Sequence, residues 1–457
     1  MTSHQALEIF LEKERELYKY KIGSITLWNL YRTTYRYRFV SSTTGVSSIT
    51  NRSSRWKIMR SMIMGGYKSV KCLYDIFRYN RTYDNLVISF GRLQSIGDVY
   101  FDKFSDPVID ASDLKNSICI FQQPNANVDI NLRRHKESVI PLDFLYLLTY
   151  LLIPIYCLWH IFSGNSYKIY KLYCKTQSIF QLSLKDLLYM NEKYMSLKIR
   201  SFFYYVILDR IKIKRIFGAG RRSYMDVTYA AHQLGIPVFE FQHGVTFGDT
   251  EYYSGPQCIS IDPDFFLAFG DLWNGNQFGI ASKKIINIGW AYKSECTIPG
   301  KEIVTNSVLL ISSPEITHKI LKTAIDLTIE YPHYKFFIRC HPYEKYSNEQ
   351  MEIVNRTSNL FLDDNSIDSF VALCQYQYVV GENSSVVYEA LSIGKPVGRL
   401  CYNGLNSTRF SNVADDGFVY LYKNEDFMKL VNSTTNCADN KAYYDFKTER
   451  FNNLLKS

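Results

Sequence analysis

Two adjacent serines, Ser384 and Ser385, stand in the segment YVVGENSSVVYEALSIGKPV, residues 378–397. The apolar run at 378–380 predicts a buried strand, and residues 386–392 predict the helix that follows it. The turn between them would present backbone N–H groups and two hydroxyls at the positive end of a helix, which suits a phosphate. The same serines would equally serve as a plain helix N-cap, so both interpretations stay open.

Further polar side chains extend this predicted anion site. His341 follows a strand predicted at 335–339, and ligands bind beyond the carboxyl ends of strands in an open parallel sheet. It would donate a hydrogen bond to a phosphate, or else be a loop histidine packed on Pro342. Glu389 lies one helical turn beyond Ser385, on the same face. The residues expected at this site are His341, Ser384, Ser385, Glu389, Arg339, Gly381, Ser312 and Ser313.

His243 is the candidate general base. It follows a strand predicted at 238–242, and imidazole titrates in the range that suits taking a proton from a hydroxyl. Asp249 and Glu251 are close enough in sequence to orient this histidine or to replace it. A structural histidine near the boundary of two domains is the alternative.

Arg221 and Arg222 follow another predicted strand and would either pair with phosphates or remain solvated surface charges. The Gly-Ala-Gly before them lacks GxGxxG spacing, so it predicts no dinucleotide cofactor. Asp262 and Asp264 form an Asp-Pro-Asp that precedes a strand instead of ending one, and the ten cysteines lack metal-ligand spacing. We therefore expect neither a metal ion nor a bound cofactor.

The elements that must position these residues alternate between strand and helix, which predicts parallel sheets covered on both faces. Two runs of alternation, divided near Gly289, predict an α/β protein with two Rossmann-like halves facing a cleft. The strands are expected at 86–90, 117–121, 139–142, 215–218, 238–242, 265–269 and 285–288, then at 308–312, 335–339, 360–362, 378–380 and 397–400. The predicted parts are a basic helical region (1–80), an N-terminal domain (81–288) with an apolar helical insertion around 144–205, a C-terminal domain (289–430) and a tail (431–457).

The composition is that of a folded, basic protein. Its 457 residues are 46% hydrophobic and 21% charged, and the net charge of +9 suits an acidic partner. No basic run matches a nucleic-acid motif, so a membrane face or a phosphorylated substrate is favoured. The cysteines are expected to be reduced thiols of a cytosolic protein, and the charged N-terminus lacks the apolar core of a secretory signal.

Residues 144–162 form a 19-residue stretch without formal charge, close to the length that spans a bilayer. Sequence on both sides resembles parts of one α/β domain, which argues against a span. We expect a buried or membrane-dipping helix pair, broken at Pro154, with a transmembrane helix as the alternative. The basic stretch at 168–175 favours contact with an anionic leaflet.

Five segments resemble bacterial capsule and O-antigen glycosyltransferases of the GT-B fold, and the resemblance covers roughly residues 210–400. The last two segments are similar to the HP and SS motifs of bacterial sialyltransferases and polysialyltransferases. They also resemble CDP-glycerol glycerophosphotransferases and Kdo transferases. The segments are GIPVFEFQHGV (235–245), FFLAFGDLW (265–273), INIGW (286–290), FFIRCHPYE (336–344) and GENSSVVYEALSIGKPV (381–397).

The resemblance implies a metal-independent glycosyltransferase with its nucleotide-activated donor on the C-terminal domain and its acceptor on the N-terminal one. It implies that His341, Ser384 and Ser385 bind a CMP-, CDP- or UDP-linked donor, that Glu389 contacts the ribose and that His243 is the base. The acidic motif of polysialyltransferases is not evident, which puts a sialic acid donor in doubt.

The expected acceptor is a polyprenyl-diphosphate-linked oligosaccharide of O-antigen, lipopolysaccharide or capsule synthesis. The expected location is the inner face of the cytoplasmic membrane, peripherally bound, without nucleic acid as a partner. The alternatives are a CDP-polyol phosphotransferase, a nucleotide-sugar epimerase and a non-catalytic component of polysaccharide assembly.

Overall fold

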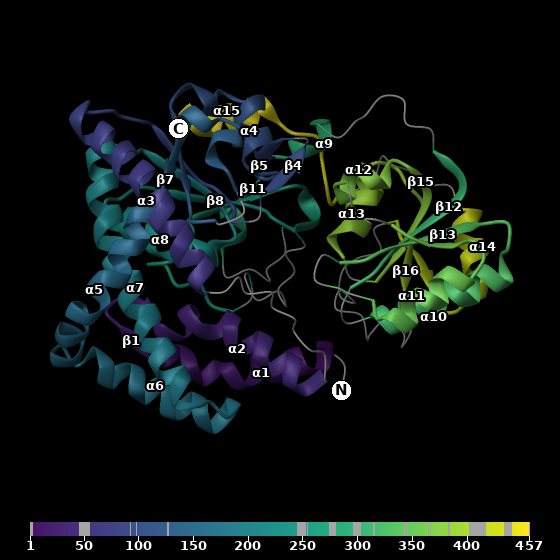
Figure 1. The fold of residues 1–457 in the computed structure, drawn as a ribbon, viewed down its shortest axis with the longest axis horizontal. Coiled ribbons are helices and arrows are strands. Elements are labelled where there is room, and N and C mark those ends of the chain that lie inside the picture. Colours follow the sequence, from purple (N-terminus) through teal and green to yellow (C-terminus); the bar gives the residue numbers. More distant parts are fainter. Residues whose placement is uncertain are drawn as a thin grey trace.

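The computed structural model forms two α/β domains side by side (Figure 1). It describes the chain except residues 1–2, 45–54, 92, 97, 126–127, 245–252, 254, 274–279, 296–302, 314–315, 342–343, 345, 364, 366, 383, 402–416, 434–440 and 457.

The N-terminal domain is built on a seven-stranded parallel sheet in the order β11-β10-β9-β8-β3-β6-β7. Its central strands are buried on both faces, which explains their continuous apolar runs. The order along the sheet reverses between β3 and β8, and ligands bind at such switch points. The strands are β3 (Asn85–Ile88), β6 (Ile118–Gln122), β7 (Val139–Pro141), β8 (Arg215–Ala219), β9 (Val238–Phe241), β10 (Phe265–Ala268) and β11 (Ile285–Asn287).

The C-terminal domain has a six-stranded parallel sheet in the order β14-β13-β12-β15-β16-β17. Counted along the chain, this is the Rossmann order 3-2-1-4-5-6, with its switch point between β12 and β15. The strands are β12 (Val304–Ile311), β13 (Lys335–Arg339), β14 (Leu360–Leu362), β15 (Tyr376–Gly381), β16 (Val397–Leu400) and β17 (Val419–Leu421).

Helices cover both faces of each sheet. On the N-terminal sheet, α3 (Arg55–Arg78), α5 (Asp143–Phe162), α7 (Leu184–Ile211) and α8 (Met225–Gln233) share one apolar core. The opposite face carries α4 (Asp106–Ala111) and α15 (Thr448–Lys456). The C-terminal sheet packs α10 (Thr317–Glu330), α11 (Asn348–Arg356) and α14 (Phe427–Val431) on one face, with α12 (Ser369–Leu373) and α13 (Ser385–Ser392) turned toward the N-terminal domain (Figure 1).

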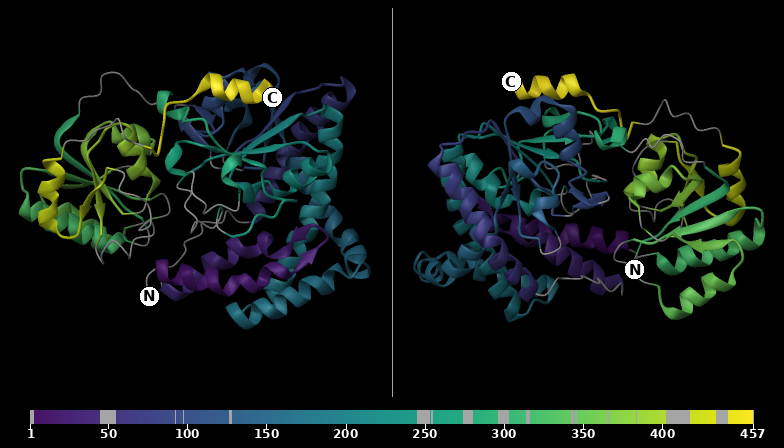
Figure 2. Two further views of the ribbon diagram at one scale, coloured as in Figure 1. Left: turned by 180° about the vertical axis from the view of Figure 1, so that it is seen from behind. Right: turned by 45° about the horizontal axis from the view of Figure 1, so that its top comes forward.

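A separate helical part lies at one end of the N-terminal domain. It has its own apolar core and comprises α1 (Ser3–Glu14), α2 (Leu27–Thr44), the hairpin of β1 (Lys21–Ile22) and β2 (Ile25–Thr26), and α6 (Asn165–Phe180). Glu14 ties this part together, because its carboxylate accepts hydrogen bonds from Arg32 and from the Trp28 indole at 2.7 Å. In Figure 2 these helices and α15 lie at opposite ends of the domain.

The end of the chain returns to the N-terminal domain, which the sequence did not predict. A Cβ on Gly270 would lie 2.2 Å from the carbonyl oxygen of Lys441, and one on Gly289 would lie 2.1 Å from that of Asp445. Phe451 of α15 then packs against Phe217 of β8, with ring centroids 5.7 Å apart. Glycine in FFLAFG and INIG is therefore required by the close approach of the returning backbone.

One local prediction is wrong, and two elements were missed. The apolar segment forms one continuous helix, α5, with Pro154 inside it. Pro154 is exposed, so the carbonyl that loses its N–H partner faces outward, where the interruption is tolerated. Strand β17 and helix α11 of the C-terminal domain were not predicted, and only a few residues of α11 are apolar.

Candidate functional site

Two polar contacts join the domains in front of the C-terminal sheet. Both come from the antiparallel hairpin of β4 (Gln94–Ile96) and β5 (Val99–Phe101) and the turn that follows it. The Gln94 amide donates to the carboxylate of Asp368 at 2.7 Å. The Lys103 ammonium lies 4.0 Å from Glu389 Oε1 on α13, and only 15% of its side chain is exposed. This hairpin was not predicted from the sequence, because it is short and lacks an apolar pattern.

Glu389 is a buried carboxylate in the middle of α13, one turn after its first residue. Burial raises its pKa above the ordinary value, while the Lys103 charge and the Ser385 hydroxyl act in the opposite direction. Its Oε2 has no hydrogen-bond partner among the described residues. A buried, unsatisfied acceptor oxygen costs free energy, so this position is suited to accepting a hydrogen bond from a ligand hydroxyl.

Ser384 is the N-cap of α13 and accepts a hydrogen bond from the Val386 amide at 3.3 Å. The cap interpretation is thus confirmed for Ser384, and Ser385 occupies the first helical position. Gly381 ends β15, where a Cβ would lie 2.8 Å from Val387, so α13 packs closely on this strand. The helix therefore starts directly at the switch point, with its N-terminal amides at the carboxyl edge of the sheet.

Glu344 organises the two neighbouring strand ends and was not among the predicted site residues. Its carboxylate accepts a hydrogen bond from the Ser312 hydroxyl at 2.6 Å and from the His341 amide at 2.9 Å. The Ser313 carbonyl accepts from the Ile316 amide at 2.9 Å. Ser312 therefore holds the loop in shape. The position of Glu344 three residues after His341, a spacing that lets a side chain reach a backbone N–H, was the available signal.

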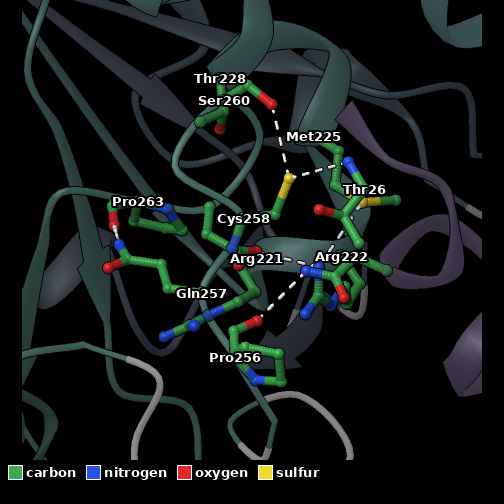
Figure 3. Close-up of polar contacts among 12 residues, drawn as sticks. Thr26, Arg221, Arg222, Met225, Thr228, Pro256, Gln257, Cys258, Ser260 and Pro263 are labelled. Atoms are coloured by element: carbon green, nitrogen blue, oxygen red, sulfur yellow. Dashed lines mark hydrogen bonds and ion pairs between the residues drawn. The ribbon is translucent and has the colours of Figure 1, made fainter. Parts of the chain in front are cut away.

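Three arginines predicted to meet phosphates are held by internal carboxylates. Arg339 donates to Asp363 at 2.6 Å and to the Ile367 carbonyl. Arg221 donates to Glu240 at 2.7 Å, and Arg222 donates to Asp262 at 2.9 Å. Figure 3 shows Arg221 and Arg222 inside the fold, beside the segment that runs from Pro256 to Pro263. The alternative of solvated surface charges is wrong for this pair, since both side chains are buried.

His243 follows β9, the strand next to β8, and its ring reaches toward Phe90, which follows β3 at the switch point of the N-terminal sheet. Its Nδ1 lies 2.7 Å from the Tyr253 hydroxyl, and its ring packs against Phe90 and Phe104 at centroid distances of 5.5 and 6.2 Å. Gly220 makes this packing possible: its φ is +71°, and a Cβ there would lie 2.9 Å from the Phe90 ring. The predicted partners Asp249 and Glu251 lie outside the described residues, whereas Tyr253 was missed.

Gln242 fixes the turn that carries His243. Its side-chain oxygen accepts from the Phe269 amide at 2.8 Å, and its amide donates to the Gly244 carbonyl at 2.8 Å. Because Gln242 is fully buried, both bonds are shielded from water. The histidine is consequently held on a rigid strand end.

Asp102 links His243 to the domain contact. It accepts hydrogen bonds from the Phe90 amide at 2.7 Å and the Phe104 amide at 3.0 Å, and burial raises its pKa to about 6. Lys103, the next residue, lies over the Phe104 ring at 5.6 Å. A series of contacts, His243–Phe104–Lys103–Glu389, therefore crosses from one domain to the other. We refer to it as the cross-domain series.

A groove of about 650 Å³ lies at the opposite edge of the N-terminal sheet. Its lining includes Pro237 and Phe265 at the amino ends of β9 and β10, together with Cys258. His243 follows the carboxyl end of β9, so the groove does not belong to the candidate site. Among the described residues, no group of three or more His, Cys, Asp or Glu side chains could hold a metal ion.

No protein-family model matches the chain, and no curated protein sequence matches it. Solved structures match its fold. The UDP-GlcNAc 2-epimerase from Methanocaldococcus jannaschii aligns at 11% identity and a TM-score of 0.50, over 81% of this chain and 99% of its own. The Neisseria meningitidis UDP-GlcNAc 2-epimerase, bound to UDP-GlcNAc, aligns at 15% identity and a TM-score of 0.49, over 82% of this chain and 100% of its own. The wall teichoic acid polymerase TagF aligns at 10% identity and a TM-score of 0.45, over 86% of this chain and 97% of its own.

Identities of this size show the fold alone. The alignment with the Methanocaldococcus jannaschii enzyme, together with the two sheet orders, confirms the predicted class: a GT-B-like α/β fold with an added helical N-terminal region.

Proposed function

We propose that the protein is a metal-independent glycosyltransferase that moves a sugar from a nucleotide-activated donor to an acceptor hydroxyl. The observation that carries this proposal is the cross-domain series. It brings a strand-end histidine of one domain within three contacts of Glu389, which lies one turn into α13 of the other. A transfer reaction needs a base for the acceptor and an electropositive site for the leaving nucleotide. His243 would supply the base, and Lys103 together with the N-terminal amides of α13 would supply the positive site.

On the donor side, the N-terminal amides of α13 and the Ser385 hydroxyl bind the phosphates, and Oε2 of Glu389 accepts from a ribose hydroxyl. Lys103 contributes a mobile positive charge. Without a donor it lies against Glu389, and with one it turns to the phosphates and balances the charge that develops there.

On the acceptor side, we assign the tautomer in which His243 Nδ1–H donates to the Tyr253 oxygen, so that Nε2 is the ring nitrogen that acts as the base. Nε2 takes the proton of the acceptor hydroxyl, and that oxygen forms a bond to the anomeric carbon. The bond from this carbon to the donor phosphate breaks, and its electron pair leaves on the phosphate oxygen. The acceptor that we propose is a lipid-linked oligosaccharide of O-antigen or capsule synthesis.

Thermal stabilisation by CMP, CDP, UDP, GDP and dTDP tests the donor site, because a ligand that binds only the folded state raises the Tm. We expect one nucleotide to stabilise the wild type, and Ser385→Ala and Glu389→Gln to weaken the effect. Glu352→Gln is the matched control, since that carboxylate is exposed on α11 and pairs only with a neighbouring arginine within the described residues. The absence of any stabilisation, or equal stabilisation of all variants, would refute the donor site.

Epimerisation is the second candidate, because the fold extends over 99% of an epimerase chain. Incubation of the protein with nucleotide sugars in the absence of acceptor separates the candidates. An epimerase converts the donor to its epimer, whereas a transferase needs an acceptor and releases the nucleotide. A CDP-polyol phosphotransferase would release CMP in place of CDP, and a non-catalytic component would change none of these donors.

A further inference from the structure

Helix α5 exposes an apolar face that no described part of the chain covers. It is the one helix among the described residues that is long and apolar enough to cross a membrane, and only 17% of its apolar window is buried. Phe162 at its end is 87% exposed. Such a contiguous apolar face marks an interaction surface in a folded protein. The other large exposed side chains of α5 are Tyr150, Leu151, Ile155, Leu158, Trp159 and Ile161.

Helix α3 lies beside α5 and carries a second exposed apolar stripe. Its members recur every three or four residues, which places them on one side of the helix. A different stripe, with Met62 and Ile76, faces the core. The outer stripe is therefore not required for packing α3 onto the domain. It consists of Met59, Ile63, Tyr67, Val70 and Tyr74, with Met64 adjoining.

Most charges on and beside these two helices are positive, and the acidic residues of the helices themselves are Asp75 near the end of α3 and Asp143 at the start of α5. No acidic residue stands between Glu16 and Asp75, and none stands between Asp143 and Asp186. Exposed basic side chains flank the outer stripe of α3 and the start of α6, and each such charge near an anionic lipid surface favours binding. They are Arg60, Lys68, Lys71 and Arg78 on α3, and Lys168 and Lys171 on α6.

Both ends of α5 are fixed to the domain, which argues against a span. Leu145 near its start is buried in the core that α5 shares with α7. His160 near its end is 2.8 Å from the Asn191 side chain of α7 and packs on Tyr194. A span would require α5 to leave α7, whereas a helix lying in the interface keeps these contacts.

We propose that the exposed faces of α3 and α5 form a docking surface for an anionic phospholipid bilayer, with both helices parallel to the membrane plane. The surface belongs to the domain that carries His243 and lies on its side remote from the C-terminal domain (Figure 1). The inference of lipid binding depends on the exposed side chains alone. Only its purpose, bringing the domain to a lipid-linked acceptor, rests on the proposed function.

Co-sedimentation of the full chain with vesicles tests this surface. Vesicles of phosphatidylcholine are compared with vesicles that also contain phosphatidylglycerol. We expect binding to the anionic vesicles, reduced by salt. Leu158→Ser with Phe162→Ser, or Ile63→Ser with Tyr67→Ser, should weaken it at least tenfold. Lys68→Gln and Lys71→Gln should weaken it about fivefold each.

The matched control is Ile329→Ser, which removes an equally exposed side chain on α10 of the C-terminal domain and should bind like the wild type. Nucleotide-induced stabilisation of each variant shows that it is folded and keeps the donor site. Unchanged vesicle binding by the α3 and α5 variants would overturn the proposal. It would also be overturned if the wild type bound no vesicles but formed a dimer that these variants disrupt. If the wild type binds anionic vesicles but no nucleotide, the proposed function is refuted and the docking surface is not.

Discussion

Glu389→Gln separates a functional carboxylate from a structural one, because it removes the charge and keeps the shape. In the folded protein, burial gives Glu389 a pKa above the ordinary 4.5. The folded state therefore binds this proton more tightly than the unfolded chain does. The resulting stability is fully present below pH 4.5 and is lost as the pH rises through the folded pKa. Ionisation of this buried carboxylate above its folded pKa thus lowers the free energy of unfolding.

Two opposite effects are expected of the glutamine variant. Its Tm at neutral pH should equal or exceed that of the wild type, and the difference should close as the pH falls below 4.5. Its affinity for the nucleotide should fall, because a hydrogen bond to a charged acceptor contributes about 1.5–3 kcal/mol. This corresponds to a loss of roughly tenfold to 150-fold in Kd.

Calorimetric titration of the nucleotide and thermal melting over a pH series measure both effects on the same samples. Lys103→Met and the double variant complete a mutant cycle, which shows whether Lys103 acts on the nucleotide through Glu389 or independently. A variant that melts well below the wild type at neutral pH, yet binds nucleotide unchanged, would refute the reasoning. Glu389 would then be a structural partner of Lys103.

Four further predictions concern the acceptor side, the leaving group and the returning chain. His243→Ala should lower the transfer rate about 10²- to 10⁴-fold without changing nucleotide affinity. Tyr253→Phe should lower the transfer rate less than His243→Ala does, because it removes the hydrogen bond that orients the ring and keeps the imidazole. Lys103→Met should weaken binding of a nucleoside diphosphate but not of the nucleoside, measured by titration. Gly289→Ala should lower the Tm, since its φ is +76° and its Cβ would meet a carbonyl, whereas Gly66→Ala has open space and should not.

The strands were predictable because they are buried on both faces. A buried parallel strand needs an uninterrupted apolar run, and runs such as LVI, FGA and YVV mark β3, β8 and β15 in the sequence itself. The role of Ser384 was also predictable from local chemistry, because a helix start needs a side-chain acceptor at the cap.

Long-range pairing was not predictable. Arg221 follows a strand end in the manner of a phosphate ligand, but its partner Glu240 stands 19 residues later and faces inward. Lys103 carries no motif, and its role depends on a contact with Glu389 in the other domain. The close approach of the Asp445 carbonyl to Gly289 likewise depends on the return of the chain to the N-terminal domain, which no local sequence pattern predicts.

The buried carboxylates of Glu240 and Glu389 show why the second is expected to serve a ligand. Burial raises the pKa of both. Glu240 is compensated, because it accepts from the Arg221 amide at 2.9 Å and from the Arg221 guanidinium at 2.7 Å. Glu389 has a lysine at 4.0 Å and one oxygen with no partner among the described residues. Apolar groups of the same size would stabilise such a site at least as well. Glu389 lies at a domain contact, one turn from a helix N-terminus, and its burial does not stabilise the fold. Its presence is therefore better explained by a hydrogen bond that it accepts from a hydroxyl of a bound donor.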